Sequence, residues 1–157
     1  MKRALLCLLL ACLVTGHAHA AEPAPLDAGA IPALTTPPAH GERIIALWSL
    51  DCAYCEANLN ALAKLQRAHP DAIELVVVAT DGPAQRQAVT ARLRAMNMAD
   101  AGKASYFYVE PAPERLNYLL DPDWGGELPR TLVIRADGTR TGISGELTAR
   151  QLGRITP

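Results

Sequence analysis

The chain has 157 residues, half of which are apolar, and its 15 basic and 16 acidic side chains give a formal net charge of −1. This length and composition predict one domain with a hydrophobic core. The balanced charge, without any basic block, argues against nucleic-acid binding and against electrostatic attachment to an anionic membrane.

The first twenty residues predict an export signal. The segment "MKRALLCLLLACLVTGHAHA" has two basic residues, then an apolar run, then an Ala-x-Ala site that ends at Ala20. These are the three parts of a secretory signal peptide. The apolar run is shorter than the ~20 residues that a membrane-spanning helix needs. We therefore expect cleavage after residue 20 and a periplasmic or secreted protein. Lipidation at Cys12 is the alternative, because "LLAC" weakly resembles a lipobox.

Removal of the signal would change both the charge and the cysteine content. Lys2 and Arg3 would be lost from the 15 basic residues, so 13 would face 16 acidic ones and the net charge would become −3. The two cysteines of the signal would be lost as well, which leaves Cys52 and Cys55. An exported protein meets an oxidising environment, in which a disulfide between these two residues can persist.

Residues 21–42 have the composition of a linker. They contain five prolines, at positions 23, 25, 32, 37 and 38. Proline-rich segments favour extended backbone without a packed core. We therefore expect an extended or disordered arm over 21–42, followed by one folded domain over 43–157.

From residue 43 onward, strand and helix patterns alternate. Residues 43–49 form a short apolar run rich in β-forming residues, which predicts a buried strand. Residues 73–81 are nearly all apolar and β-branched, which is typical of a strand buried on both faces of a parallel sheet. Between them, leucines repeat every third residue, which predicts an amphipathic helix over 56–69 that ends before Pro70.

The second half of the chain adds a β-hairpin to this alternation. Pro83 suits the first position of a helix, and Asp137–Gly138 separates two strand-like runs as a hairpin turn does. The expected elements are a helix over 83–98, a strand over 104–110, a helix over 114–120, a hairpin over 130–144 and a helix over 147–155. This order predicts an α/β fold, with a mixed sheet and helices on both faces.

Cys52 and Cys55 lie where the first strand ends and the first helix begins. The first N–H groups of a helix have no partner within it, and its dipole is positive there, so a thiolate at this place is stabilised. A spacing of three residues puts the sulfurs one turn apart, within disulfide reach. The first sulfur can then attack a partner disulfide, and the second can resolve the mixed disulfide.

The sequence around these cysteines resembles the thioredoxin superfamily. "IIALWSLDCAYC" is similar to its strand, Trp and CxxC, and "GELPRTLVIRADGTRTGISG" is similar to its later Pro, strand, turn and second strand. The Pro-x-Thr run is most similar to the secreted TlpA-like and cytochrome-c-maturation branch. The resemblance covers roughly residues 41–155 and implies a thioredoxin-like fold and a thiol–disulfide oxidoreductase.

The resemblance also assigns roles to individual residues. It implies that Cys52 is the nucleophile and Cys55 the resolving thiol. Pro129 would be the cis-proline that packs against the disulfide, and Leu128 would offer backbone contacts to a substrate. Tyr54, between the cysteines, is a candidate substrate contact or simply an exposed aromatic residue. By analogy the partners are protein thiols and disulfides, with a membrane thiol reductase as electron donor, and we expect a monomer without an organic cofactor.

Several positions differ from the pattern of the superfamily, including Asp51, which replaces the usual Trp before the first cysteine, and the uncommon dipeptide Ala53–Tyr54. Ala46 stands where many thioredoxins have a buried acidic residue, and Asn58 stands where TlpA-like reductants have Glu. Asn60 replaces the proline that bends the corresponding helix of thioredoxins. The groups that handle protons in those relatives are therefore not matched in this chain.

The residues next to the cysteines predict the direction of electron flow. Asp51 and Glu56 flank the pair, and no Lys, Arg or His lies over 48–63. Negative charge disfavours a thiolate, so we expect the pKa of the Cys52 thiol to lie nearer the value of about 7 of thioredoxin than the value of about 3.5 of a strong oxidant. A less stabilised thiolate favours the disulfide, which predicts a reductant rather than an oxidant.

The cysteine pair could also have a role without redox cycling. It could be a structural disulfide, although such bridges in secreted proteins usually come in sets. A zinc site needs more ligands, and only His40 and His69 remain after the signal, neither at ligand spacing; we therefore expect no metal centre. A chaperone or a copper- or metal-delivery module would use the thiols for binding without cycling them.

Overall fold

The computed structural model describes residues 22–98 and 104–155, and the predicted signal peptide and Cys12 lie outside these residues. Six strands form one sheet in the order β1-β4-β3-β2-β5-β6. The first four in this order are parallel to one another, β5 is antiparallel to β2, and β6 is antiparallel to β5. The strands are β1 (Ala24–Leu26), β2 (Glu42–Trp48), β3 (Ile73–Ala79), β4 (Ala104–Tyr108), β5 (Arg130–Arg135) and β6 (Arg140–Ser144).

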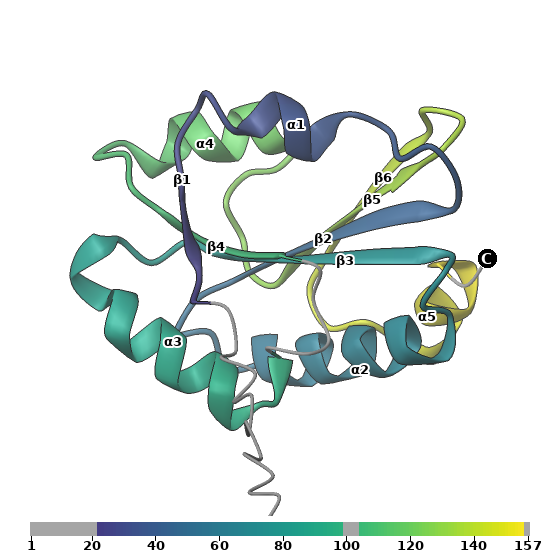
Figure 1. The fold of residues 1–157 in the computed structure, drawn as a ribbon, viewed down its shortest axis with the longest axis horizontal. Helices are drawn as coiled ribbons and strands as arrows, with labels where there is room; N and C mark the ends of the chain where they lie inside the picture. The colour runs from purple at the N-terminus through teal and green to yellow at the C-terminus, as the bar shows by residue number, and fades with distance from the viewer. Residues whose placement is uncertain (1–21, 99–103, 156–157) are drawn as a thin grey trace, which may run out of the picture.

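Helices cover both faces of this sheet, as Figure 1 shows. Helices α1 and α4 lie on one face, and α2, α3 and α5 lie on the other. The helices are α1 (Ile31–Thr35), α2 (Cys55–Ala68), α3 (Arg86–Ala95), α4 (Pro113–Leu120) and α5 (Ala149–Ile155), with a short 3-10 turn η1 (Pro83–Gln85) before α3. The predicted α/β architecture, with a mixed sheet and a late hairpin, is confirmed.

The central strands are buried on both sides, which explains their continuous apolar runs. In β2, Ile44, Ala46 and Trp48 belong to the core cluster that includes residues of α2, α3 and α5. The alternate residues Ile45 and Leu47 belong to the cluster that includes residues of α1 and α4. Because successive side chains of a strand point to opposite faces, a strand between two helical layers has no polar face.

The N-terminal arm is part of the folded unit, so the prediction of an extended or disordered linker is wrong for most of it. Strand β1 pairs in parallel with β4 at the edge of the sheet. Leu26 of β1 and Ile31 and Leu34 of α1 are buried in the core cluster that also contains residues of α4. Proline is compatible with an edge strand and with the first turn of a helix, so the prolines here do not prevent either element.

The second predicted helix is shorter than the pattern suggested. It begins with η1 and continues as α3, which ends at Ala95 rather than at residue 98. Asn97 has a φ of 52°, and Asn is one of the few residues that adopts this left-handed conformation readily after a helix. The apolar pattern continues beyond the end because Met98 is buried in the core.

The C-terminal elements follow their local sequence signals. Gly138 supplies a φ of 87° in the hairpin turn, and the side chains of Thr148 and Gln151 bond to each other's backbone N–H groups before α5, as in a capping box. Within residues 22–98 and 104–155, no helix has the length and apolar content needed to cross a membrane.

Candidate active site

The two cysteines are joined by a disulfide at the carboxyl end of β2. Cys52 and Cys55 have their Cα atoms 5.5 Å apart. A tight turn leads into the helix: the Cys52 N–H donates to the Ser49 carbonyl, and the Cys55 N–H donates to the Cys52 carbonyl, both at 3.3 Å. Helix α2 begins at Cys55, so the disulfide lies at its positive end.

The two sulfur-bearing residues differ in exposure. Cys55 is completely buried, whereas Cys52 is partly exposed. A partner disulfide can therefore approach Cys52 more readily than Cys55. Tyr54, between them, is 62% exposed, so its ring is available at the surface beside the disulfide.

Antiparallel pairing brings the proline loop to the same end of the sheet. Leu47 near the end of β2 pairs with Arg130 at the start of β5, so Pro129 lies next to the strand that leads to the cysteines. The Leu128–Pro129 peptide bond is cis, and Pro129 is buried. Leu128 and Cys52 both pack against the core cluster that contains Cys55.

Asn58 connects the cysteine helix to the loop that follows β6. It is 3% exposed and lies one turn after Cys55. Its Nδ2 donates to the Gly145 carbonyl at 3.0 Å, and its Oδ1 accepts the Leu147 N–H at 2.9 Å. Both ends of the amide are thus used, so a neutral and structural side chain occupies the position at which TlpA-like reductants have Glu.

A buried carboxylate lies beside the turn that precedes Cys52. Asp81 follows β3 and is 8% exposed, and its Oδ2 accepts the Leu50 N–H at 3.1 Å. Burial raises the pKa of Asp81, the backbone hydrogen bonds partly offset this, and the charge of Asp51 raises the pKa further. Sequence reasoning missed this residue, although an acid directly after an apolar parallel strand was the available signal.

The surroundings of the cysteines are less negative than the neighbouring sequence predicts. Glu56, in the first turn of α2, forms an ion pair with Arg92 of α3. The prediction counted only residues close in sequence and therefore missed this cation. Among the other positions that differ from the superfamily pattern, Ala46 is buried in the core and Asn60 is exposed on α2.

The side chains described here do not suggest a metal centre at the cysteines. Over residues 22–98 and 104–155, no group of three or more His, Cys, Asp or Glu residues could hold a metal ion. His40 lies at the start of β2, the opposite end of that strand from the cysteines, and His69 follows the last residue of α2.

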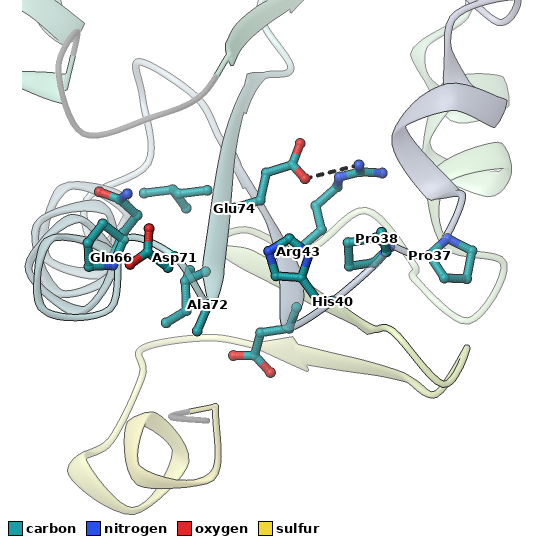
Figure 2. A pocket seen from close by; sticks show the side chains of 13 residues that line it. Pro37, Pro38, His40, Arg43, Gln66, Asp71, Ala72 and Glu74 are labelled. Carbon is teal, nitrogen blue, oxygen red and sulfur yellow. Dashed lines mark hydrogen bonds and ion pairs between the residues drawn. The ribbon is translucent and has the colours of Figure 1, made fainter.

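A cavity of about 660 Å³ lies at this opposite end, and His40 is one of the residues that line it (Figure 2). Arg43 crosses it: Nη2 bonds to Glu74 at 3.1 Å, and Nη1 donates to carbonyls of α1 and its C-cap, including Leu34 at 2.9 Å and Thr36 at 2.7 Å. Arg43 thus fixes α1 to the central strands, and the cavity is separate from the cysteine site.

Comparison with protein-family models and with curated protein sequences finds no match. Solved structures do match. A secreted disulfide oxidoreductase of Mycobacterium tuberculosis, homologous to DsbE of E. coli, is 21% identical, with a TM-score of 0.54 over 73% of this chain and 80% of that one.

Two further structures give the same result. StoA of Bacillus subtilis is 20% identical, with a TM-score of 0.51 over 77% of this chain and 86% of that one. A thiol:disulfide interchange protein of the thioredoxin family from Chlorobium tepidum TLS is 17% identical, with a TM-score of 0.55 over 74% of this chain and 77% of that one. The protein therefore has the thioredoxin-like fold, and the resemblance seen in its sequence is confirmed at the level of the fold.

Proposed function

We propose that this protein is an exported thiol–disulfide oxidoreductase that exchanges disulfides with protein substrates through Cys52 and Cys55. The observation that carries the proposal is the disulfide at the start of α2, in which one cysteine is partly exposed and the other is buried. The solved structures of the same fold include disulfide oxidoreductases and interchange proteins, which supports the same class of activity here.

The chemistry needs two thiols and no further group. In the reduced protein the Cys52 thiolate attacks one sulfur of a substrate disulfide, and the other substrate sulfur leaves as a thiolate that takes up a proton. The Cys55 thiolate then attacks Cys52 Sγ and releases the second substrate thiol. The substrate gains two electrons and two protons, and the protein is left with its disulfide.

We infer a reductant rather than an oxidant. Asp51 and the buried Asp81 both lie beside the turn that carries Cys52, and negative charge there disfavours the thiolate. The Glu56–Arg92 pair reduces the contribution of Glu56 without adding net positive charge. A reductant must itself be reduced, and a membrane thiol reductase is the donor that we propose, in the periplasm or outside the cell.

The remaining roles are proposals of the same kind. Leu128 and Tyr54 would contact the substrate, and Pro129 would shape the site. We propose a monomer that needs no organic cofactor, no metal and no nucleic acid. The other candidate, a chaperone or metal-delivery module with the same fold, would bind through its thiols without cycling them.

Trapping of mixed disulfides tests this function. A Cys55→Ala variant cannot resolve the bond that Cys52 forms, so it should accumulate covalent adducts with protein substrates that dithiothreitol releases. A Cys52→Ala variant is the matched control and should form none, because Cys55 is buried. A binding module would show no adduct with either variant, and that result would contradict the proposal.

A further inference from the structure

A buried ion pair joins the two ends of the segment 121–130, which contains Pro129. Asp121 follows α4, and Arg130 opens β5; their side chains are 8% and 9% exposed. Nε and Nη2 of Arg130 both donate to Asp121 Oδ2, at 3.1 and 2.7 Å. Asp121 Oδ1 accepts the Asp123 N–H at 3.3 Å, so both carboxylate oxygens are engaged.

The guanidinium of Arg130 also contacts Ser144 of β6 and Glu127. Nη1 of Arg130 donates to Ser144 Oγ at 2.7 Å and lies 3.7 Å from Glu127 Oε1. The Ser144 hydroxyl donates to that same Glu127 oxygen, and Trp124 Nε1 donates to the Glu127 carbonyl at 2.7 Å. Glu127 is therefore held by both its side chain and its backbone.

Gly142 of β6 leaves room for the Arg130–Asp121 ion pair because it has no side chain. A Cβ placed on Gly142 would lie 2.6 Å from Cζ of Arg130 and 2.8 Å from Oδ2 of Asp121. Real Cβ contacts are not this short, so only glycine lets the guanidinium and its carboxylate lie against the strand. The ion pair is thus accommodated by three separate parts of the chain.

Leu128 lies between Glu127 and Arg130, the two residues that these contacts hold in place. It is partly exposed, and within residues 22–98 and 104–155 its backbone N–H and C=O make no intramolecular hydrogen bond. Backbone groups in this state can pair with an extended chain, as in peptide recognition by strand addition. Such pairing requires the donor and acceptor to be held in direction as well as position.

A buried ion pair adds little net stability, because desolvation cancels most of the attraction between the charges. Its value is geometric, since the fixed donors of a guanidinium hold their acceptors at defined places. We propose that the Arg130–Asp121 pair is a positioning device that fixes the Glu127–Leu128 edge for backbone pairing with an extended protein substrate. This inference rests on the proposed function, and it states how the site would favour polypeptides over small disulfides.

The test compares two substrates of the reduced protein: insulin, and a nitrobenzoate disulfide that has no peptide backbone. Loss of backbone pairing in Arg130→Met should slow the reaction with insulin about tenfold, because one or two hydrogen bonds to the substrate backbone are lost. The reaction with the small disulfide, and the equilibrium constant with dithiothreitol, should change less than about twofold.

Two further variants distinguish a loss of positioning from a loss of folding. Arg130→Met leaves Asp121 buried and unpaired, so the double variant Arg130→Met with Asp121→Leu removes both charges and should fold better; it should show the same selective loss. The matched control is Arg115→Met, which breaks the exposed Arg115–Glu110 pair, 3.0 Å long, on the same face. It should leave both rates unchanged.

Each outcome decides the inference. A loss confined to insulin supports a positioning role. Equal losses with both disulfides, or no loss in the double variant, would overturn it while leaving the thiol–disulfide function in place. If the unaltered protein reduced neither disulfide, the proposed function and this inference would both fail.

Discussion

Asn58 Nδ2 donates to the carbonyl of Gly145 at 3.0 Å, across 87 residues of sequence. The N–H of the same Gly145 donates to the carbonyl of Pro129 at 2.9 Å. The helix that carries Cys55 is therefore joined to the proline loop through one glycine. A side chain that is not itself reactive thus holds the two halves of the candidate active site together.

Replacement of Asn58 should weaken the whole fold. Asn58→Ala leaves the buried Leu147 N–H and the Gly145 carbonyl without their partner, and each unsatisfied group costs about 1–3 kcal/mol. We expect the free energy of unfolding of the oxidised protein to fall by about 2 kcal/mol or more in urea denaturation.

The control is Asn60→Ala on the exposed side of the same helix. It should change the free energy of unfolding by less than about 0.5 kcal/mol. Equal effects of the two substitutions would show that the Asn58 hydrogen bonds contribute nothing specific.

Asp81 should make stability depend on pH. Burial raises its pKa in the folded state above the ordinary value of 3.8, so the folded protein binds this proton more tightly than the unfolded chain does. The stabilisation is complete below pH 3.8 and is lost as the pH rises through the raised value. Glu42, whose pKa burial also raises from 4.5, contributes a second loss of the same sign.

Asp81→Asn removes one of these two ionisations and keeps an oxygen for the Leu50 N–H. In the unaltered protein the free energy of unfolding falls as the pH rises through this window. We expect this fall to be less steep in Asp81→Asn, by an amount that corresponds to up to about one bound proton. Denaturation of the oxidised protein at several pH values measures it, with Asp71→Asn, an exposed carboxyl, as control. An unchanged slope in Asp81→Asn would show that Asp81 does not bind a proton preferentially in the folded state.

The described part of the N-terminal arm, residues 22–42, should be needed for stability. Leu26 is fully buried under α1 and α4, so Leu26→Ala should cost about 2–5 kcal/mol. The control is Leu119→Ala on α4, where the side chain is 38% exposed, and it should cost less than about 1 kcal/mol. Thermal or urea denaturation compares them, and a Leu26→Ala protein as stable as the control would mean that the arm is dispensable.

Substitutions of Glu56 and of Arg92 should shift the pKa of the Cys52 thiol in opposite directions. Arg92→Met leaves the charge of Glu56 uncompensated at the start of α2, which should raise the pKa of Cys52 in the reduced protein. Glu56→Gln should lower it. Because both side chains are partly exposed, we expect small shifts in the pKa of Cys52 that shrink further in high salt. Thiolate absorbance against pH measures them, and shifts of the same sign would contradict this electrostatic mechanism.

The sequence predicted what depends on neighbours along the chain. The apolar runs of β2 and β3, the turn at Gly138 and the CxxC at a helix start each carry a local signal, and all appear in the structure. The prediction for the N-terminal arm is wrong because its prolines are a local signal too, whereas the burial of Leu26 depends on α4, far along the chain.

The missed parts of the candidate site all depend on contacts between distant residues. Asn58 stands out in the sequence only as a departure from a family pattern, because its hydrogen-bond partners lie 87 and 89 residues away. Arg92 compensates Glu56 across 36 residues. Such pairs become visible only once the sheet order brings β2, β3 and β5 together.

The central claim is that Cys52 and Cys55 form a reversible redox couple of low potential. Equilibrating the protein, from residue 21 onward, in dithiothreitol and glutathione buffers, and quantifying the two thiols at each ratio, measures this potential directly. We predict a single two-electron transition at about −270 mV or lower, as in thioredoxin. A value near −120 mV, as for strong oxidants, would contradict the assignment as a reductant. The absence of any reversible transition would contradict thiol–disulfide exchange itself and favour a binding module.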